Sequence, residues 1–162
     1  MNARPTCLVI GAGAGNGLAI ASAFGKKGFH LVLASRSKDG RSKLIAELES
    51  EGVDANGIDV DCADPKAVSE AVAKLGPVDV LVYNAAAFTM APTSSLDPKR
   101  FIADITNSAV SALAAAQAVI PDMKARGHGT ILFTGGGFAL VTGRGKPRHG
   151  KGRTSQSGIL TS

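Results

Sequence analysis

Residues 6–17 read TCLVIGAGAGNG, an apolar run that leads directly into a cluster of glycines. The run Thr6–Ile10 predicts a short buried strand, and the segment Gly15–Lys27 that follows has apolar residues at helical spacing. A strand, a glycine turn and a helix in this order present free backbone amides and the positive end of a helix to a pyrophosphate. Glycine suits the turn because a Cβ would block close backbone approach or forbid the turn angles. The stretch therefore predicts nucleotide binding, and the alternative is a tight turn that binds nothing.

The rest of the body alternates short apolar runs with helix-length segments. Further strands are predicted at Leu31–Ala34, Ala55–Val60, Val78–Tyr83 and Thr130–Thr134. Helices are predicted at Ser42–Glu51, from Asp64-Pro65 to Gly76-Pro77, and at Pro98–Arg126, with a kink expected at Pro121. Runs that are apolar throughout are typical of parallel strands buried on both faces. The alternation predicts an α/β fold, a doubly wound parallel sheet of about five strands.

The net charge of +5 is not spread evenly along the chain. Residues 1–140 contain 13 Lys and Arg and 13 Asp and Glu, whereas residues 141–162 contain five basic residues and no acidic one. The apolar periodicity also ends near Leu140. We therefore predict one domain over residues 1–140, followed by a basic, Gly-rich, disordered tail over residues 141–162.

The cysteines and histidines give no sign of a disulfide framework or a metal site. Cys7 and Cys62 lack CxxC spacing, and none of the three histidines has a carboxylate or cysteine partner at ligand spacing. The N-terminus lacks a signal-peptide pattern, and no apolar run approaches the roughly 18 residues that a membrane span needs. The expectation is a cytoplasmic protein with no bound metal and no membrane partner.

The spacing of Gly11, Gly15 and Gly17 fits the pattern G-x-x-x-G-x-G. It resembles the glycine motif T-G-x-x-x-G-x-G of the short-chain dehydrogenase/reductase family, with Ile10 in place of the threonine. The resemblance extends over residues 6–140 and implies a Rossmann-like dinucleotide-binding fold, incomplete relative to the family. It also implies hydride transfer between a carbonyl and an alcohol, on a substrate that the sequence does not identify. The loop residues that it assigns to the cofactor are Gly11, Ala14, Gly15, Asn16 and Gly17.

The end of the second predicted strand favours NADP(H) over NAD(H). An acidic residue there would accept hydrogen bonds from the ribose hydroxyls of NAD. Ser35 stands in that place, and Arg36 follows with a guanidinium suited to a 2′-phosphate. Ser37 adds a further hydroxyl donor. The alternative is that Arg36 is simply a solvated residue after a strand.

Two more segments match the cofactor site of the family. Asp59-Val60 follows the third strand, where the family holds the adenine, although Asp59 has the alternative of being a solvated turn residue. Asn84-Ala85-Ala86 resembles the N-A-G segment, with Ala86 in place of the glycine. Asn84 is expected to bond across neighbouring strand ends, so its role is structural as well as ligand-binding.

Most of the catalytic set of the family is missing from this sequence. The resemblance assigns Asn107 to the catalytic asparagine, whereas Gly136 occupies the place of the catalytic serine and Thr134, two residues earlier, is the candidate substitute. Tyr83 is the only tyrosine, so no Tyr-x-x-x-Lys segment follows the fifth strand. The expected consequence is impaired or absent turnover, because the acid/base and its lysine partner are lacking.

Two hypotheses account for these features. The first is a truncated or frame-altered family member that binds NADP(H) and exposes the Ala-rich segment 109–120, which favours homo-oligomers. The second is a nonenzymatic nucleotide-binding protein whose basic tail contacts an acidic partner. Nucleic acid is the less favoured partner, because residues 141–162 contain no aromatic residue for base stacking.

Overall fold

The structure is a computed structural model, and it describes residues 4–136. Its five strands form one parallel sheet in the order β3-β2-β1-β4-β5. The strands are β1 (Thr6–Ile10), β2 (His30–Ser35), β3 (Ala55–Asp59), β4 (Val80–Tyr83) and β5 (Thr130–Phe133). The helices are α1 (Asn16–Gly25), α2 (Lys38–Ser50), α3 (Pro65–Ala73), α4 (Pro98–Ile105) and α5 (Ser111–Arg126). The α/β prediction and its five strands are confirmed.

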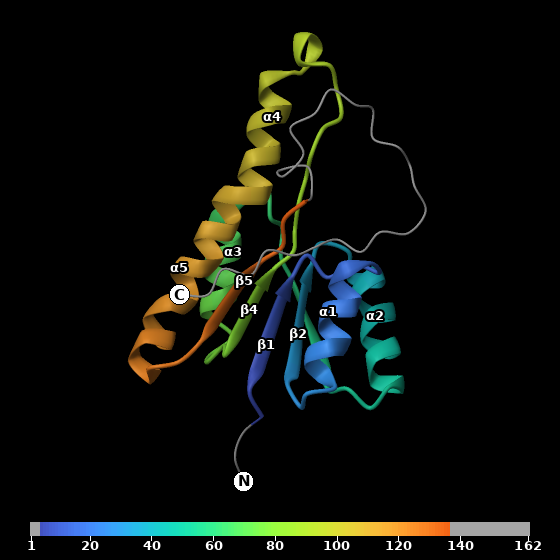
Figure 1. Ribbon diagram of the computed structural model, residues 1–162, viewed down its shortest axis with the longest axis vertical. Helices are drawn as coiled ribbons and strands as arrows, with labels where there is room; N and C mark the ends of the chain where they lie inside the picture. The colour runs from blue at the N-terminus through green and yellow to red at the C-terminus, as the bar shows by residue number, and fades with distance from the viewer. Residues whose placement is uncertain (1–3, 137–162) are drawn as a thin grey trace.

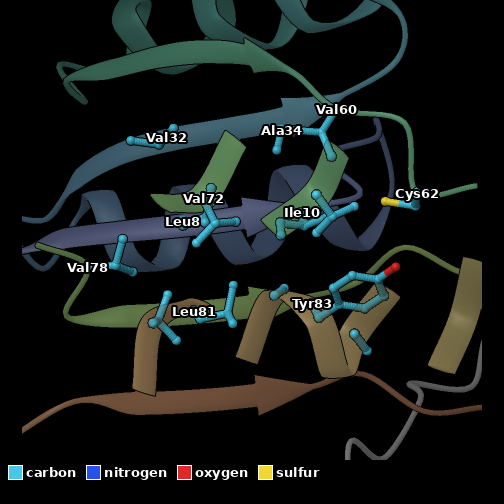
Figure 2. Close-up of a cluster of buried hydrophobic side chains, with 14 of the residues drawn as sticks. Leu8, Ile10, Val32, Ala34, Val60, Cys62, Val72, Val78, Leu81 and Tyr83 are labelled. Atoms are coloured by element: carbon cyan, nitrogen blue, oxygen red, sulfur yellow. The ribbon is translucent and has the colours of Figure 1, made fainter. Parts of the chain in front are cut away.

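Helices cover both faces of the sheet (Figure 1), which explains why its strands are apolar throughout. Successive side chains of a strand point to opposite faces, so β1 contributes to two separate cores. Leu8 and Ile10 pack on the side of α3 and α5 (Figure 2), whereas Cys7 and Val9 pack on the side of α1 and α2. All four side chains are fully buried. The paired cores hold the strand ends, and hence the loops that follow them, in fixed positions.

Helix caps set several of the element boundaries. Asp64 accepts hydrogen bonds from the main-chain amides of Lys66 and Ala67, and Asp97 accepts one from Lys99, as the two Asp-Pro pairs predict. The helix predicted at Ser42–Glu51 begins earlier, at Lys38, because the Ser37 hydroxyl accepts a hydrogen bond from the Gly40 amide and caps it. The prediction of the start was therefore wrong by one turn.

The long helix predicted over Pro98–Arg126 is interrupted by a wider turn. Residues 106–110 form a π-helical segment between α4 and α5, in which the Ser111 amide donates to the Thr106 carbonyl. Such insertions are frequent at functional sites. Gly127 ends α5 in the left-handed conformation, with φ of 73°, and this confirms the predicted stop.

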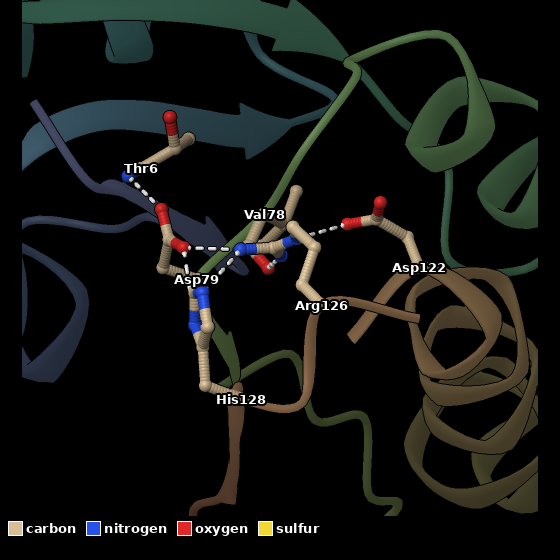
Figure 3. A network of polar contacts seen from close by, with 6 residues as sticks. All are labelled: Thr6, Val78, Asp79, Asp122, Arg126 and His128. Carbon is tan, nitrogen blue, oxygen red and sulfur yellow. Dashed lines mark hydrogen bonds and ion pairs between the residues drawn. The ribbon is translucent and has the colours of Figure 1, made fainter. Parts of the chain in front are cut away.

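An ion-pair network joins β4 to the end of α5 at the amino-terminal edge of the sheet (Figure 3). Arg126 donates to the carboxylates of Asp79 (2.6 Å) and Asp122 (2.7 Å) and to the main-chain carbonyl of Val78 (2.8 Å). Asp79 also accepts the main-chain amide of Thr6 at 2.7 Å. The network joins the amino-terminal ends of β1 and β4 to the carboxyl-terminal end of α5. It therefore lies at the opposite edge of the sheet from the carboxyl ends of the strands.

Several large apolar side chains remain exposed along α4, the π-helical segment and α5. They are Phe101, Ile102, Ile105, Val110, Leu113 and Ile120. Within residues 4–136, none of the helices has both the length and the apolar character required to cross a membrane. The predicted disordered tail at 141–162 lies outside the described residues.

Candidate functional site

The carboxyl ends of β1, β2 and β4 meet around an open cleft of about 650 Å³. This position is where ligands bind in open α/β sheets, next to the point where the strand order reverses. Of the residues predicted for the site, the cleft is lined by Gly11, Ser35, Arg36, Ser37, Val60, Asn84, Ala85, Ala86 and Asn107. Four further lining residues, Ala12, Gly13, Cys62 and Ala87, were not predicted. Segments as far apart as Gly11 and Asn107 are thus brought together.

The glycine loop approaches neighbouring backbone where its glycines require it. Gly11 has φ of 83°, and a Cβ there would overlap the backbone of Ala85 at the end of β4. A Cβ at Gly17 would lie 2.9 Å from the Gly11 carbonyl oxygen, so the buried turn of α1 needs a glycine to pack under the loop. At Gly13 and Gly15 an added Cβ meets no atom of the described chain within 4 Å. Steric crowding therefore explains Gly11 and Gly17 and leaves the other two unexplained.

The remaining loop residues lie at the start of α1. Ala14, Gly15 and Asn16 are exposed, and they are not among the residues that line the cleft. Within residues 4–136, no side chain caps the amino end of α1. Within that described part of the chain the amides of Asn16 and Gly17 have no backbone partner, whereas the Leu18 amide donates to the Gly13 carbonyl at 2.9 Å. The first two amides of α1 are therefore available to an anion.

Asn84 ties three strand ends together at the floor of the cleft. Its side-chain amide donates to the Gly11 carbonyl at the end of β1 at 2.9 Å, and its side-chain oxygen accepts the Thr134 hydroxyl after β5 at 3.0 Å. This bonding across strand ends is what the sequence predicted for Asn84. The Thr134 hydroxyl, the candidate substitute for the missing catalytic serine, is therefore already hydrogen-bonded to Asn84.

The loop after β2 places two serines and an arginine on the cleft wall. Arg36 is exposed, and within residues 4–136 it takes part in none of the ion pairs. The Ser35 hydroxyl donates to the Ser37 carbonyl at 3.3 Å, and the Ser37 hydroxyl caps α2. The guanidinium of Arg36 is thus the group of this loop that remains available for an anionic ligand.

The neighbouring residues Asp59 and Val60, at the end of β3, have different surroundings. Val60 lines the cleft, whereas the Asp59 carboxylate is paired with Arg41 of α2. Arg41 is a buried cation that the sequence analysis did not single out. The sequence did contain a signal for this, because Arg41 shares the helical spacing of the apolar residues Leu44 and Leu48. A charged residue on a buried helix face is expected to have a partner, since charged residues are rarely fully buried unless paired.

Asn107 reaches the cleft from the π-helical segment. The buried hydroxyl of Tyr83 donates to the main-chain carbonyl of Asn107, and the Ser108 hydroxyl accepts the Ala87 amide at 3.1 Å and donates to the Ala87 carbonyl at 3.0 Å. Burial raises the pKa of Tyr83 well above its usual value. Tyr83 therefore remains a neutral hydrogen-bond donor that holds the segment in place.

Cys62 is a cleft residue that motif matching could not find. Its thiol is free and mostly buried, and burial raises its pKa. The Ser111 hydroxyl donates to the main-chain carbonyl of Cys62 at 2.8 Å, which joins the loop after β3 to the start of α5. Across residues 4–136, no group of three or more His, Cys, Asp or Glu residues is placed to hold a metal ion.

Comparison with known proteins agrees with this geometry. A sequence model of the family described as short chain dehydrogenase matches residues 5–147. The chain belongs to the short-chain dehydrogenase/reductase family. The match includes the first residues after Leu140, where the predicted domain ends.

Individual relatives show how much of the family architecture is represented. The chain is 31% identical to versicolorin reductase of Emericella nidulans over 159 residues, which are 95% of this chain and 59% of the relative. A crystal structure of an actinorhodin polyketide ketoreductase variant with NADPH superposes with a TM-score of 0.81 at 27% identity, covering 87% of this chain and 56% of that one. A metagenomic short-chain oxidoreductase in complex with NADP gives a TM-score of 0.77 at 26% identity, covering 82% and 62%. The chain therefore spans less than two thirds of each of these relatives.

Proposed function

We propose that this short-chain dehydrogenase/reductase chain binds NADP(H) in the cleft at the carboxyl ends of β1, β2 and β4. The observation that carries the proposal is the convergence of the glycine loop, the Ser35–Ser37 loop and the Asn84–Ala86 segment on one cleft. Its volume, about 650 Å³, is in the range of small-molecule and cofactor sites. Two structural relatives, the ketoreductase variant and the metagenomic oxidoreductase, contain NADPH or NADP.

The residues present fit a dinucleotide. The uncapped first turn of α1 suits a pyrophosphate, and the space around Gly13 and Gly15 is open, since a Cβ at either meets no atom of residues 4–136 within 4 Å. Arg36 suits a 2′-phosphate, because a guanidinium binds phosphate through two parallel hydrogen bonds, and Ser35 and Ser37 line the cleft on either side of it. We assign Asp59-Val60 to the adenine end, with Val60 lining the cleft as an apolar contact.

The reaction class that follows is hydride transfer between a carbonyl and an alcohol. When bound, the nicotinamide supplies the hydride chemistry. Asn107 lies on the cleft wall, held through Tyr83, where it can orient a water molecule or the substrate. The 162 residues contain no Tyr-x-x-x-Lys segment, and Gly136 carries no hydroxyl at the position of the family serine. We therefore propose binding without efficient turnover for this chain by itself.

Calorimetric titration of the 162-residue chain with NADPH and with NADH tests the cofactor assignment. We expect NADPH to bind more tightly, by about tenfold, which corresponds to one charge-assisted hydrogen bond to the 2′-phosphate. Arg36→Gln is expected to remove the preference, and Lys38→Gln, a charge change two residues further on, serves as the matched control. Equal affinity of the unchanged chain for the two dinucleotides would exclude the phosphate role of Arg36.

A single-turnover assay with NADPH and a panel of aldehydes and ketones tests the catalytic half of the proposal. The expected result is NADPH binding with no oxidation above the rate without protein. Rapid single-turnover oxidation that disappears in Asn107→Ala would show that these residues support catalysis without the tyrosine and lysine of the family.

A further inference from the structure

Arg41 is a buried cation on the apolar face of α2. Arg41, Leu44 and Leu48 are the buried residues of that helix, and the Arg41 side chain is only 6% exposed. Gly57 on β3 makes room for it, because a Cβ there would overlap the Arg41 side chain. Burying a cation in this way requires hydrogen-bonded partners, since an unpaired buried charge is strongly destabilising.

All the partners of Arg41 lie at the ends of β2 and β3, beside the cleft. Its guanidinium donates to the Ser35 carbonyl at 2.7 Å and to the Ser35 hydroxyl at 3.3 Å, and its other terminal nitrogen pairs with the Asp59 carboxylate. Ser35 and Asp59 are direct neighbours in the parallel register of the two strands. Arg41 therefore lies behind the cleft wall and holds both residues from the protein side.

From this arrangement we propose that Arg41 is a positioning residue that sets the preference for NADP(H). The inference rests on the proposed function and concerns the 2′-phosphate end of the same cleft. Arg41 neutralises the Asp59 carboxylate and fixes the Ser35 main chain, from which Arg36 extends. Arg41 is not among the residues that line the cleft, so it acts through Ser35 and Asp59 rather than by contact with a bound group.

The negative charge of Asp59 explains why its pairing with Arg41 matters for binding a 2′-phosphate. The Asp59 carboxylate is 73% exposed and lies one strand away from Ser35 and the adjoining Arg36. Without Arg41, this carboxylate would repel a 2′-phosphate and compete with it for Arg36. With Arg41 in place, the positive charge of Arg36 is left to the phosphate.

The test compares Arg41→Met, Asp59→Asn and the double variant by titration with NADPH, NADH and the fragment 2′,5′-ADP. Methionine keeps the length and the apolar stem of arginine and removes the charge. We expect Arg41→Met to weaken NADPH and 2′,5′-ADP by about tenfold and NADH by less than about threefold, the size of one charged hydrogen bond. The double variant is expected to recover most of the lost preference for NADPH over NADH, because it no longer contains the unpaired carboxylate.

The double variant separates the electrostatic role from a merely structural one. If Arg41→Met weakens the binding of both dinucleotides equally, the proposal is wrong. It is also wrong if adding Asp59→Asn to Arg41→Met does not restore the preference for NADPH. Asp59→Asn alone removes the carboxylate and keeps Arg41. Loss of an adenine contact would weaken both dinucleotides alike, so the ratio of NADPH to NADH affinity should be at least that of the unchanged chain. A fall of more than about threefold in that ratio would overturn the proposal even if Arg41→Met does not fold. Failure of the unchanged chain to bind NADPH would instead contradict the proposed function.

Discussion

The side-chain amide of Asn84, after β4, donates a 2.9 Å hydrogen bond to the main-chain carbonyl of Gly11, after β1. The same side chain accepts the hydroxyl of Thr134, after β5. One amide thus fixes the floor of the cleft by satisfying groups from two neighbouring strands. This link between β1, β4 and β5 makes the cleft a property of the assembled sheet rather than of the glycine loop alone.

Asn84→Ala should destabilise the fold and weaken cofactor binding together. The substitution leaves the Gly11 carbonyl and the Thr134 hydroxyl without their partner, and two such bonds contribute about 1–3 kcal/mol to the free energy of unfolding. Urea unfolding and NADPH titration measure the two effects. Asn56→Ala, on an exposed position of β3, is the matched control and should change neither. An unaltered unfolding free energy in Asn84→Ala would show that the link is not stabilising.

Gly17→Ala should destabilise the chain more than Gly15→Ala does. The methyl group at Gly17 would lie 2.9 Å from the Gly11 carbonyl oxygen and from the Ala12 Cα, so backbone must shift, whereas at Gly15 it meets no atom of residues 4–136 within 4 Å. Overpacking of this kind costs about 1–3 kcal/mol. Chemical unfolding of the two variants checks the order. Equal destabilisation would mean that the contact under the loop does not set the glycine requirement.

Asp79 should make the chain less stable as the pH falls below about 4. Burial raises the pKa of this carboxyl, but the Thr6 amide and the Arg126 guanidinium outweigh it and hold the pKa below the ordinary value of 3.8. Because the folded pKa is depressed, the stabilisation is present above the unfolded pKa and is lost as the pH falls through the folded value. Thermal unfolding between pH 7 and pH 3 should show a steeper loss for the unchanged chain than for Asp79→Asn. Glu47→Gln, at an exposed position of α2, should retain the steep loss, and a steep loss in Asp79→Asn would contradict the assignment.

Tyr83 should stay protonated in the folded chain at pH values where an ordinary tyrosine ionises. Burial raises its pKa above the usual 10.0. The chain has one tyrosine and no tryptophan, so the ultraviolet absorbance of tyrosinate reports Tyr83 alone. The unfolded chain ionises near pH 10 and the folded chain does not, so stability should fall as the pH rises above 10. Tyrosinate appearing at pH 10 before any loss of helical circular dichroism would contradict the burial of the hydroxyl.

The exposed apolar side chains of α4 and α5 should make the chain self-associate. Ile102 is 63% exposed and Leu113 is 57% exposed, on consecutive stretches of one helical run. Replacing both with lysine should lower the mass measured by sedimentation, because charged groups oppose burial in an apolar contact. Ala46→Lys, on exposed α2, should leave the mass unchanged. A monomeric unchanged chain would rule out homo-oligomers through this face.

Local sequence signals predicted the elements that depend on neighbouring residues. The apolar run before Gly11 and the spacing to Gly17 indicated a strand, a loop and a helix, and Asp64 and Asp97 marked two helix starts. The start of α2 was misplaced because Ser37 is a helix cap as well as a cleft residue. The helix predicted through Asn107 contains a π-helical turn, since Tyr83 and Ala87 bond to that segment from a distant part of the chain.

The sequence by itself determined the class of fold, the five strands and the family, because periodicity, capping and glycine spacing are set by residues close together in the chain. Only the tertiary structure decided which side chains share the cleft. Arg41 meets Asp59, 18 positions further on, because α2 packs against the end of β3. Asn84 meets Thr134, 50 positions further on, because the parallel strands β4 and β5 end side by side. No local pattern encodes those pairs, since they depend on strand order and register. They nevertheless decide which charges and hydrogen-bonding groups remain free for a cofactor.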